Sequence, residues 1–152
     1  MEIEGSEKPA YIAETLALQL QVAEVGLEEL KAMRLFLEIG QIPLIVQLAT
    51  PQVIDRLRTL VDEMEQVCDE PEKADALDMQ FHLALTGICG NRILTIFSQV
   101  IVLMFEKKHR KQFLNPAAAR KSVRDHRRMI ECLRNKDRAQ LTTLMEQHLR
   151  PI

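Results

Sequence analysis

Residues that break helices are sparse in this 152-residue chain, and their scarcity limits its possible folds more than any other feature. Only 5 glycines and 6 prolines interrupt the sequence. The long stretches between them are rich in Leu, Glu, Lys, Arg, Gln and Ala, which favour helices over strands. Aromatic residues make up 4% of the chain and tryptophan is absent, so the core must be built from aliphatic side chains. These observations predict an all-α fold.

Glycines, prolines and capping residues predict about six to seven helices, and the short links between them favour an antiparallel bundle over residues 1–152 as a single domain. The interior of such a bundle is a suitable place for a metal and ligand site. Gly40 and Pro43 should kink the second helix, because proline lacks the backbone N–H donor. The predicted helices are Pro9 to about Ala23, Gly26 to about Leu48, Pro51 to about Val67, Pro71 to Gly90, one opening at Asn91, one opening at Asn115–Pro116, and Asp137 to about Leu149.

Charge and cysteine content exclude several classes of protein. The net charge of −2 and the pI of about 6.1 predict weak binding of DNA by this chain alone. Cys68, Cys89 and Cys132 are far apart and form no CxxC pair, which argues against a disulfide framework and a zinc ribbon and suits a reducing cytoplasm. No apolar run resembles a signal peptide or reaches the length of a membrane span. We therefore expect a cytoplasmic protein without a membrane contact.

Three histidines and one aspartate fall on helix stripes that are otherwise apolar. Asp78 and His82 are four residues apart, so they lie one helical turn from each other on a stripe with other core residues. His126 shares its stripe with Met129, Ile130 and Leu133, and His148 is in line with Leu141, Leu144 and Met145. Amphipathic periodicity therefore predicts that all four polar side chains face the bundle interior.

One carboxylate and three imidazoles would be costly to bury separately, and a shared cation removes that cost. These ligands suit zinc, nickel, manganese or iron, and spacing does not distinguish these divalent metals. The alternative is that each residue is an isolated polar core residue, hydrogen-bonded to backbone or water. The fourth histidine, His109, is left out because the cations of Lys107–Lys111 would oppose a bound metal.

Several motifs resemble the FCD domain, the effector domain of FadR-type regulators in the bacterial GntR family. In combination they are specific, and they cover the chain from about Leu27 to Leu149. Asp125 stands where the family usually has glutamate, and Ile39–Pro43 replaces the proline and alanines that usually follow the early glutamate. The matching stretches are Met33–Glu38, Asp78–Leu85, Gly90–Leu94, Asp125–Ile130, Asp137 with Ala139, and Met145–Leu149.

The resemblance implies a seven-helix bundle whose metal is held by Asp78, His82, His126 and His148. It also implies a small carboxylate effector in the remaining coordination positions. Arg34 matches a family arginine that would face the same cavity, and a guanidinium suits bidentate capture of a carboxylate. Asn91 matches a family position near that cavity, although helix capping explains an asparagine there equally well.

The function that the resemblance implies is ligand sensing by a transcription regulator, not enzymatic catalysis. No winged-helix segment precedes residue 1, so DNA contact is expected only through such a domain outside this chain, which is either a fragment or a stand-alone domain. A homodimer is expected because a two-fold protein matches a palindromic operator. The alternatives are an interaction module with a structural metal and a metal-dependent enzyme that activates water or oxygen. No second acid or base lines up with the four ligands, which disfavours the enzyme.

Overall fold

The computed structural model describes residues 8–108 and 115–149, and it describes side chains for residues 11–105 and 115–149. His109 lies outside the described residues. The described part is helical throughout and contains no strand, which confirms the predicted all-α class. No described helix is both long and apolar enough to cross a membrane. The helices are α1 (Lys8–Val22), α2 (Leu27–Gly40), α3 (Ile42–Leu48), α4 (Pro51–Gln66), α5 (Pro71–Gly87), α6 (Arg92–Lys108), α8 (Pro116–Arg134) and α9 (Arg138–Leu149).

Three helix starts follow the capping signals in the sequence. The side chain of Thr50 accepts a hydrogen bond from Val53 N, and Asn115 accepts one from Ala118 N, each just before a proline at the first helical position. Asp137 caps α9 through Gln140 N. α5 ends three residues before the predicted Gly90, because Ile88, Cys89 and Gly90 close a tighter turn with bonds to residues three positions back.

The predicted kink in the second helix is confirmed as a complete break. α2 ends at Gly40 and α3 begins at Ile42, with Gln41 between them as the shared boundary residue. Pro43 lies in the first turn of α3, where its missing N–H needs no partner within the helix. The break therefore allows one continuous segment to pack against two different parts of the bundle.

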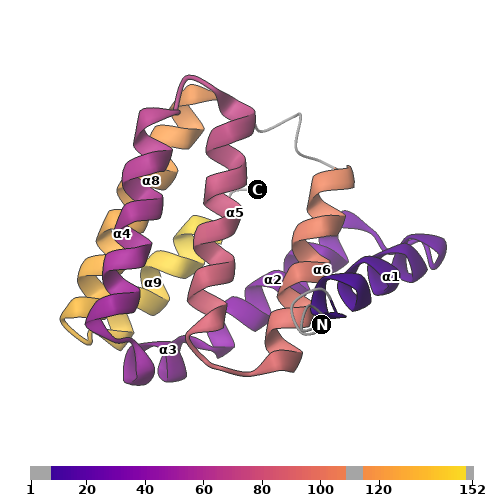
Figure 1. Cartoon of the computed structure of the whole chain (residues 1–152), viewed down its shortest axis with the longest axis horizontal. Coiled ribbons are helices and arrows are strands. Elements are labelled where there is room, and N and C mark those ends of the chain that lie inside the picture. Colours follow the sequence, from indigo (N-terminus) through magenta and orange to yellow (C-terminus); the bar gives the residue numbers. More distant parts are fainter. Residues whose placement is uncertain (1–7, 109–114, 150–152) are drawn as a thin grey trace, which may run out of the picture.

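The helices pack around two apolar clusters. The larger cluster joins α3, α4, α5, α8 and α9, and the smaller joins α1, α2 and α6. Figure 1 shows α4, α5, α8 and α9 as one bundle with α3 below it, while α6 and α1 lie to the side. α2 contacts both α6 and α9, and α5 contacts both α6 and α8. α2 and α5 therefore form the junction between the two clusters.

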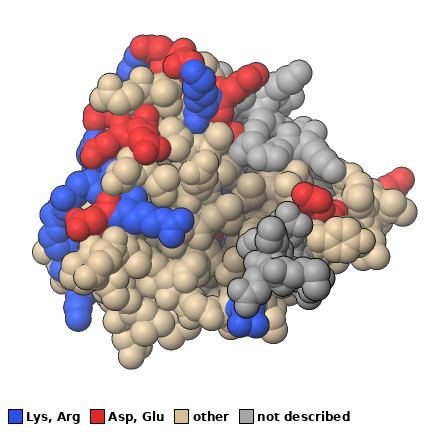
Figure 2. Space-filling view, in the orientation of Figure 1, with Lys and Arg blue, Asp and Glu red and all other residues tan. Residues whose placement is uncertain are grey.

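Charged and apolar side chains are unevenly distributed on the surface. Arg127 on α8 pairs with Asp62 and Glu65 on α4, and Arg120 pairs with Asp69. Figure 2 shows the lysine, arginine, aspartate and glutamate side chains concentrated over the α4 end of the molecule. Most of the exposed large apolar side chains lie instead on α1, α2 and α6, and two more, Leu44 and Leu48, lie on α3. Those on the first three helices are Tyr11, Ile12, Leu18 and Val22 on α1, Met33 and Phe36 on α2, and Ile93 and Phe97 on α6.

Candidate metal centre

The structure brings together all four residues that the sequence predicted as metal ligands. Asp78 and His82 come from α5, His126 from α8 and His148 from α9. Each contributes one ligand atom, and the four atoms lie within 4.8 Å of one another. His126 is fully buried, His82 and His148 are buried, and Asp78 is nearly so. The group could hold a metal ion.

Two of the imidazoles are oriented by carboxylates behind them. Nδ1 of His82 contacts Oε1 of Glu38, and Nδ1 of His148 lies 3.0 Å from Oδ2 of Asp125. An ionised carboxylate only accepts hydrogen bonds, so each Nδ1 is the donor, and in the neutral imidazole, the form that binds metals, the lone pair is then on Nε2. Carboxylates commonly orient metal-binding histidines in this way.

The resulting lone pairs face one another. Nε2 of His82 and Nε2 of His148 are 3.2 Å apart. Two acceptors at this distance repel each other unless a cation or a proton lies between them. Two ligands of a tetrahedral zinc ion are separated by about 3.3 Å, from zinc–nitrogen bonds of about 2.05 Å. The spacing therefore fits nitrogens that share one ion.

The remaining two ligand atoms have no hydrogen-bond partner within the protein. Nε2 of His126 lies 3.1 Å from Oδ1 of Asp78 without the angle of a hydrogen bond, and Nδ1 of His126 is also unpartnered. The imidazole of His126 stacks on Phe81, with ring centroids 3.8 Å apart and planes 8° from parallel. A shared proton would satisfy only the His82–His148 pair, whereas a metal ion also satisfies Asp78 and His126.

Burial and neighbouring charges set the protonation states that metal binding requires. Burial alone would raise the pKa of Asp78, but the adjacent imidazole of His126, together with those of His82 and His148, holds it well below its ordinary value. Burial lowers the pKa of His126 despite the adjacent carboxylate of Asp78. An ionised Asp78 and a neutral His126 are the forms that bind metals.

Arg34 lies beside this group on α2, in an ion pair that the sequence did not predict. Its Nε donates to Oε2 of Glu38 at 2.7 Å, and both side chains are buried. Burial disfavours both charges, yet Glu38 raises the pKa of Arg34, and His82 and Arg34 lower the pKa of Glu38 to about 2. The pair is therefore fully charged at neutral pH.

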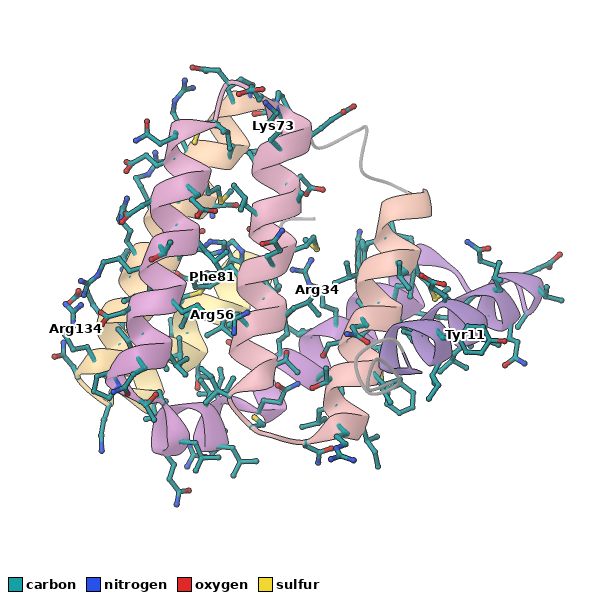
Figure 3. All side chains as sticks on the ribbon, in the orientation of Figure 1. Tyr11, Arg34, Arg56, Lys73, Phe81 and Arg134 are labelled. Carbon is teal, nitrogen blue, oxygen red and sulfur yellow. The ribbon has the colours of Figure 1, made fainter. Side chains whose placement is uncertain are left out.

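A small cavity borders Arg34 between α2, α5 and α6, in the region where Figure 3 places the arginine. Its volume of about 20 Å³ is enough for one or two water molecules. The guanidinium of Arg34 also lies over the ring of Phe105, 5.5 Å from its centroid. The cavity lining includes Arg34, Glu38, His82, Thr86, Ser98 and Phe105.

Asn91 is not brought together with the other predicted site residues. It is exposed at the start of α6, where its Oδ1 accepts hydrogen bonds from Ile93 N and Leu94 N. It is absent from the lining of the cavity beside Arg34. Helix capping accounts for this asparagine, and its contact with an effector stays a prediction.

Sequence reasoning assigned no role to Glu38 or Asp125. Glu38 is four residues after Arg34, so their pairing on one helix face could have been expected. Its contact with His82, 44 positions away, had no signal in the sequence. Asp125 precedes a predicted ligand, and its place behind His148 likewise depends on how α8 and α9 pack.

Comparison with known proteins gives one significant match. The family model of the FCD domain matches residues 29–151, which includes all four candidate ligands and Arg34. No curated protein and no solved structure matches the chain significantly. The matched range begins after α1 and includes every other described helix in whole or in large part.

Proposed function

Because the chain belongs to the FCD family, the C-terminal effector-binding domain of GntR-family regulators, we propose that it senses a small carboxylate through a bound divalent metal ion. The metal would be held by Asp78, His82, His126 and His148. DNA would be contacted through another domain of the regulator, and the chain would act in the cytoplasm. The role assigned to the chain is regulatory and includes no catalytic step.

The metal proposal rests on one observation. Three imidazole nitrogens and one carboxylate oxygen converge, and hydrogen bonds within the protein do not satisfy all four atoms. Nε2 of His82 and His148 face each other, and Nε2 of His126 and Oδ1 of Asp78 have no hydrogen-bond partner. Unpaired buried polar atoms of this kind each cost about 1–3 kcal/mol. A divalent ion would coordinate all four and polarise a carboxylate bound beside them.

The cavity beside Arg34 supports the carboxylate part of the proposal. It is bordered by the ligand His82 and by a buried guanidinium, so a carboxylate there would meet both the metal centre and a charged donor. Its volume of about 20 Å³ is smaller than any hydroxy or keto acid. The cavity must therefore widen when an effector binds.

We expect a small carboxylate to stabilise the chain only when the metal is bound. At a concentration one hundred times its dissociation constant, a ligand of the folded state adds about 2.7 kcal/mol to the free energy of unfolding. A thermal-shift screen of hydroxy, keto and dicarboxylic acids would detect this gain, with each acid tested on zinc-loaded and chelator-treated protein. If no acid shifts the zinc-loaded protein, the sensor proposal gives way to a structural metal.

We also propose that the chain forms a homodimer through the exposed apolar side chains of α1, α2 and α6. The described charges lie mainly at the opposite end of the molecule, and a regulator that binds palindromic DNA requires a two-fold axis. Apolar side chains such as Phe36 and Ile93 are the kind that a homodimer interface buries.

Sedimentation velocity over a range of concentrations should therefore show a monomer–dimer equilibrium. Replacing Phe36 and Ile93 together with glutamate should weaken the dimer at least tenfold, because each protomer would bring two charges into the interface. Thr143→Glu, which adds a charge at an exposed position of α9, should leave the equilibrium unchanged. A strictly monomeric wild type at all concentrations would exclude this dimer.

A further inference from the structure

One buried carboxylate, Glu38, connects Arg34 to the candidate metal centre. Its Oε2 accepts a hydrogen bond from Arg34 Nε at 2.7 Å, and its Oε1 contacts Nδ1 of His82. All three side chains are less than a tenth exposed. Glu38 is too far along the chain from His82 for this contact to result from local structure. The packing of α2 against the bundle brings the two together.

A second carboxylate–imidazole pair in the same site provides a comparison. Asp125 contacts Nδ1 of His148 and is itself paired with Lys121 at 2.6 Å. Lys121 is about half exposed, whereas Arg34 is buried and borders the cavity. Water can replace the partner of Asp125 at the surface. Glu38 is buried and borders only the small cavity, so its orientation is set by the two groups that it contacts.

We propose that Glu38 is a positioning residue for the metal ligand His82. It holds the proton on Nδ1 and thereby directs the lone pair of Nε2 toward the ion. Arg34 holds Glu38 in place through the hydrogen bond from its Nε. This inference rests on the proposed function, since it takes the four-residue group as a metal centre.

Two double variants distinguish a positioning role of Glu38 from a general contribution to the stability of the fold. Arg34→Met with Glu38→Gln and Arg34→Met with Glu38→Met both remove the buried ion pair, so neither strands a charge. Only the glutamine retains an oxygen that can accept the Nδ1 proton of His82. Zinc affinity would be measured by competition with a chromophoric chelator. The Glu38→Met double variant should bind zinc 10- to 100-fold more weakly than the Glu38→Gln double variant.

The tautomer of His82 provides a readout that needs no variant. In zinc-loaded wild type, ¹⁵N–¹H NMR should show His82 protonated on Nδ1 and bound to the metal through Nε2. Equal zinc affinity in the two double variants, or a metal bound through Nδ1 of His82, would overturn the role of Glu38. A wild type that binds no zinc would instead refute the proposed metal function, so the two failures are distinguishable.

Discussion

The substitution His126→Leu should abolish the stability that the chain gains from zinc. His126 is fully buried, and leucine matches its size while removing both ring nitrogens. Wild type should gain about 2.7 kcal/mol in free energy of unfolding when zinc is one hundred times its dissociation constant. The variant should gain nothing at the same concentration. Urea denaturation with zinc and with a chelator measures both values.

Met129→Leu is the matched control for this experiment. Met129 is also fully buried on α8, but it belongs to the apolar cluster and contributes no ligand atom. Its replacement should change stability by less than about 1.5 kcal/mol and leave the zinc-dependent gain intact. A zinc-dependent gain of the same size in His126→Leu and in wild type would show that zinc binds elsewhere.

Arg34→Ala should be one of the most destabilising single substitutions in the chain. It leaves the carboxylate of Glu38 buried without its cation, and breaking a buried pair in this way costs about 3–5 kcal/mol. Replacing both residues, as Arg34→Met with Glu38→Gln, should cost about 1 kcal/mol or less, because no charge is stranded. Urea denaturation of metal-free protein would compare the two variants.

The difference in stability between the single and the double variant determines how the role of Arg34 in effector binding can be tested. A single substitution changes stability and binding at once, whereas the double variant isolates the loss of the guanidinium. The double variant should retain zinc and bind a responsive carboxylate more weakly by about 1.5–3 kcal/mol, the range for a charged hydrogen bond. Equal destabilisation by the single and the double variant would contradict the ion-pair explanation.

The helices were predictable because each carries a local signal. Thr50, Asn115 and Asp137 cap helices where the sequence places a capping residue, and proline in the first turn of α3, α4, α5 and α8 marks their start. The break at Gln41 was expected from Gly40 and Pro43. α5 ends three residues before Gly90, because Ile88, Cys89 and Gly90 close its end with hydrogen bonds to carbonyls three positions back.

The inward direction of the four ligands was also predictable, since each shares a helix stripe with apolar residues. Their convergence was not. It depends on how α5, α8 and α9 pack, so the sequence offered it only as a hypothesis, from the cost of burying the four groups separately and from the resemblance to a family. The ion pair of Arg34 with Glu38 shows most clearly what could not be predicted from the sequence. The spacing of four residues was visible, but the burial of both charges beside His82 comes from the packing of α2 against the bundle.

X-ray absorption of the zinc-loaded chain is the most direct test of the claim that these four side chains form a metal centre. One zinc ion per chain is expected, with three imidazole nitrogens at about 2.0–2.1 Å and oxygen as the remaining ligand. Cys68, Cys89 and Cys132 should contribute no sulfur, because none belongs to the group. Sulfur at about 2.3 Å, or fewer than three imidazoles, would contradict the claim that these four side chains form the metal centre.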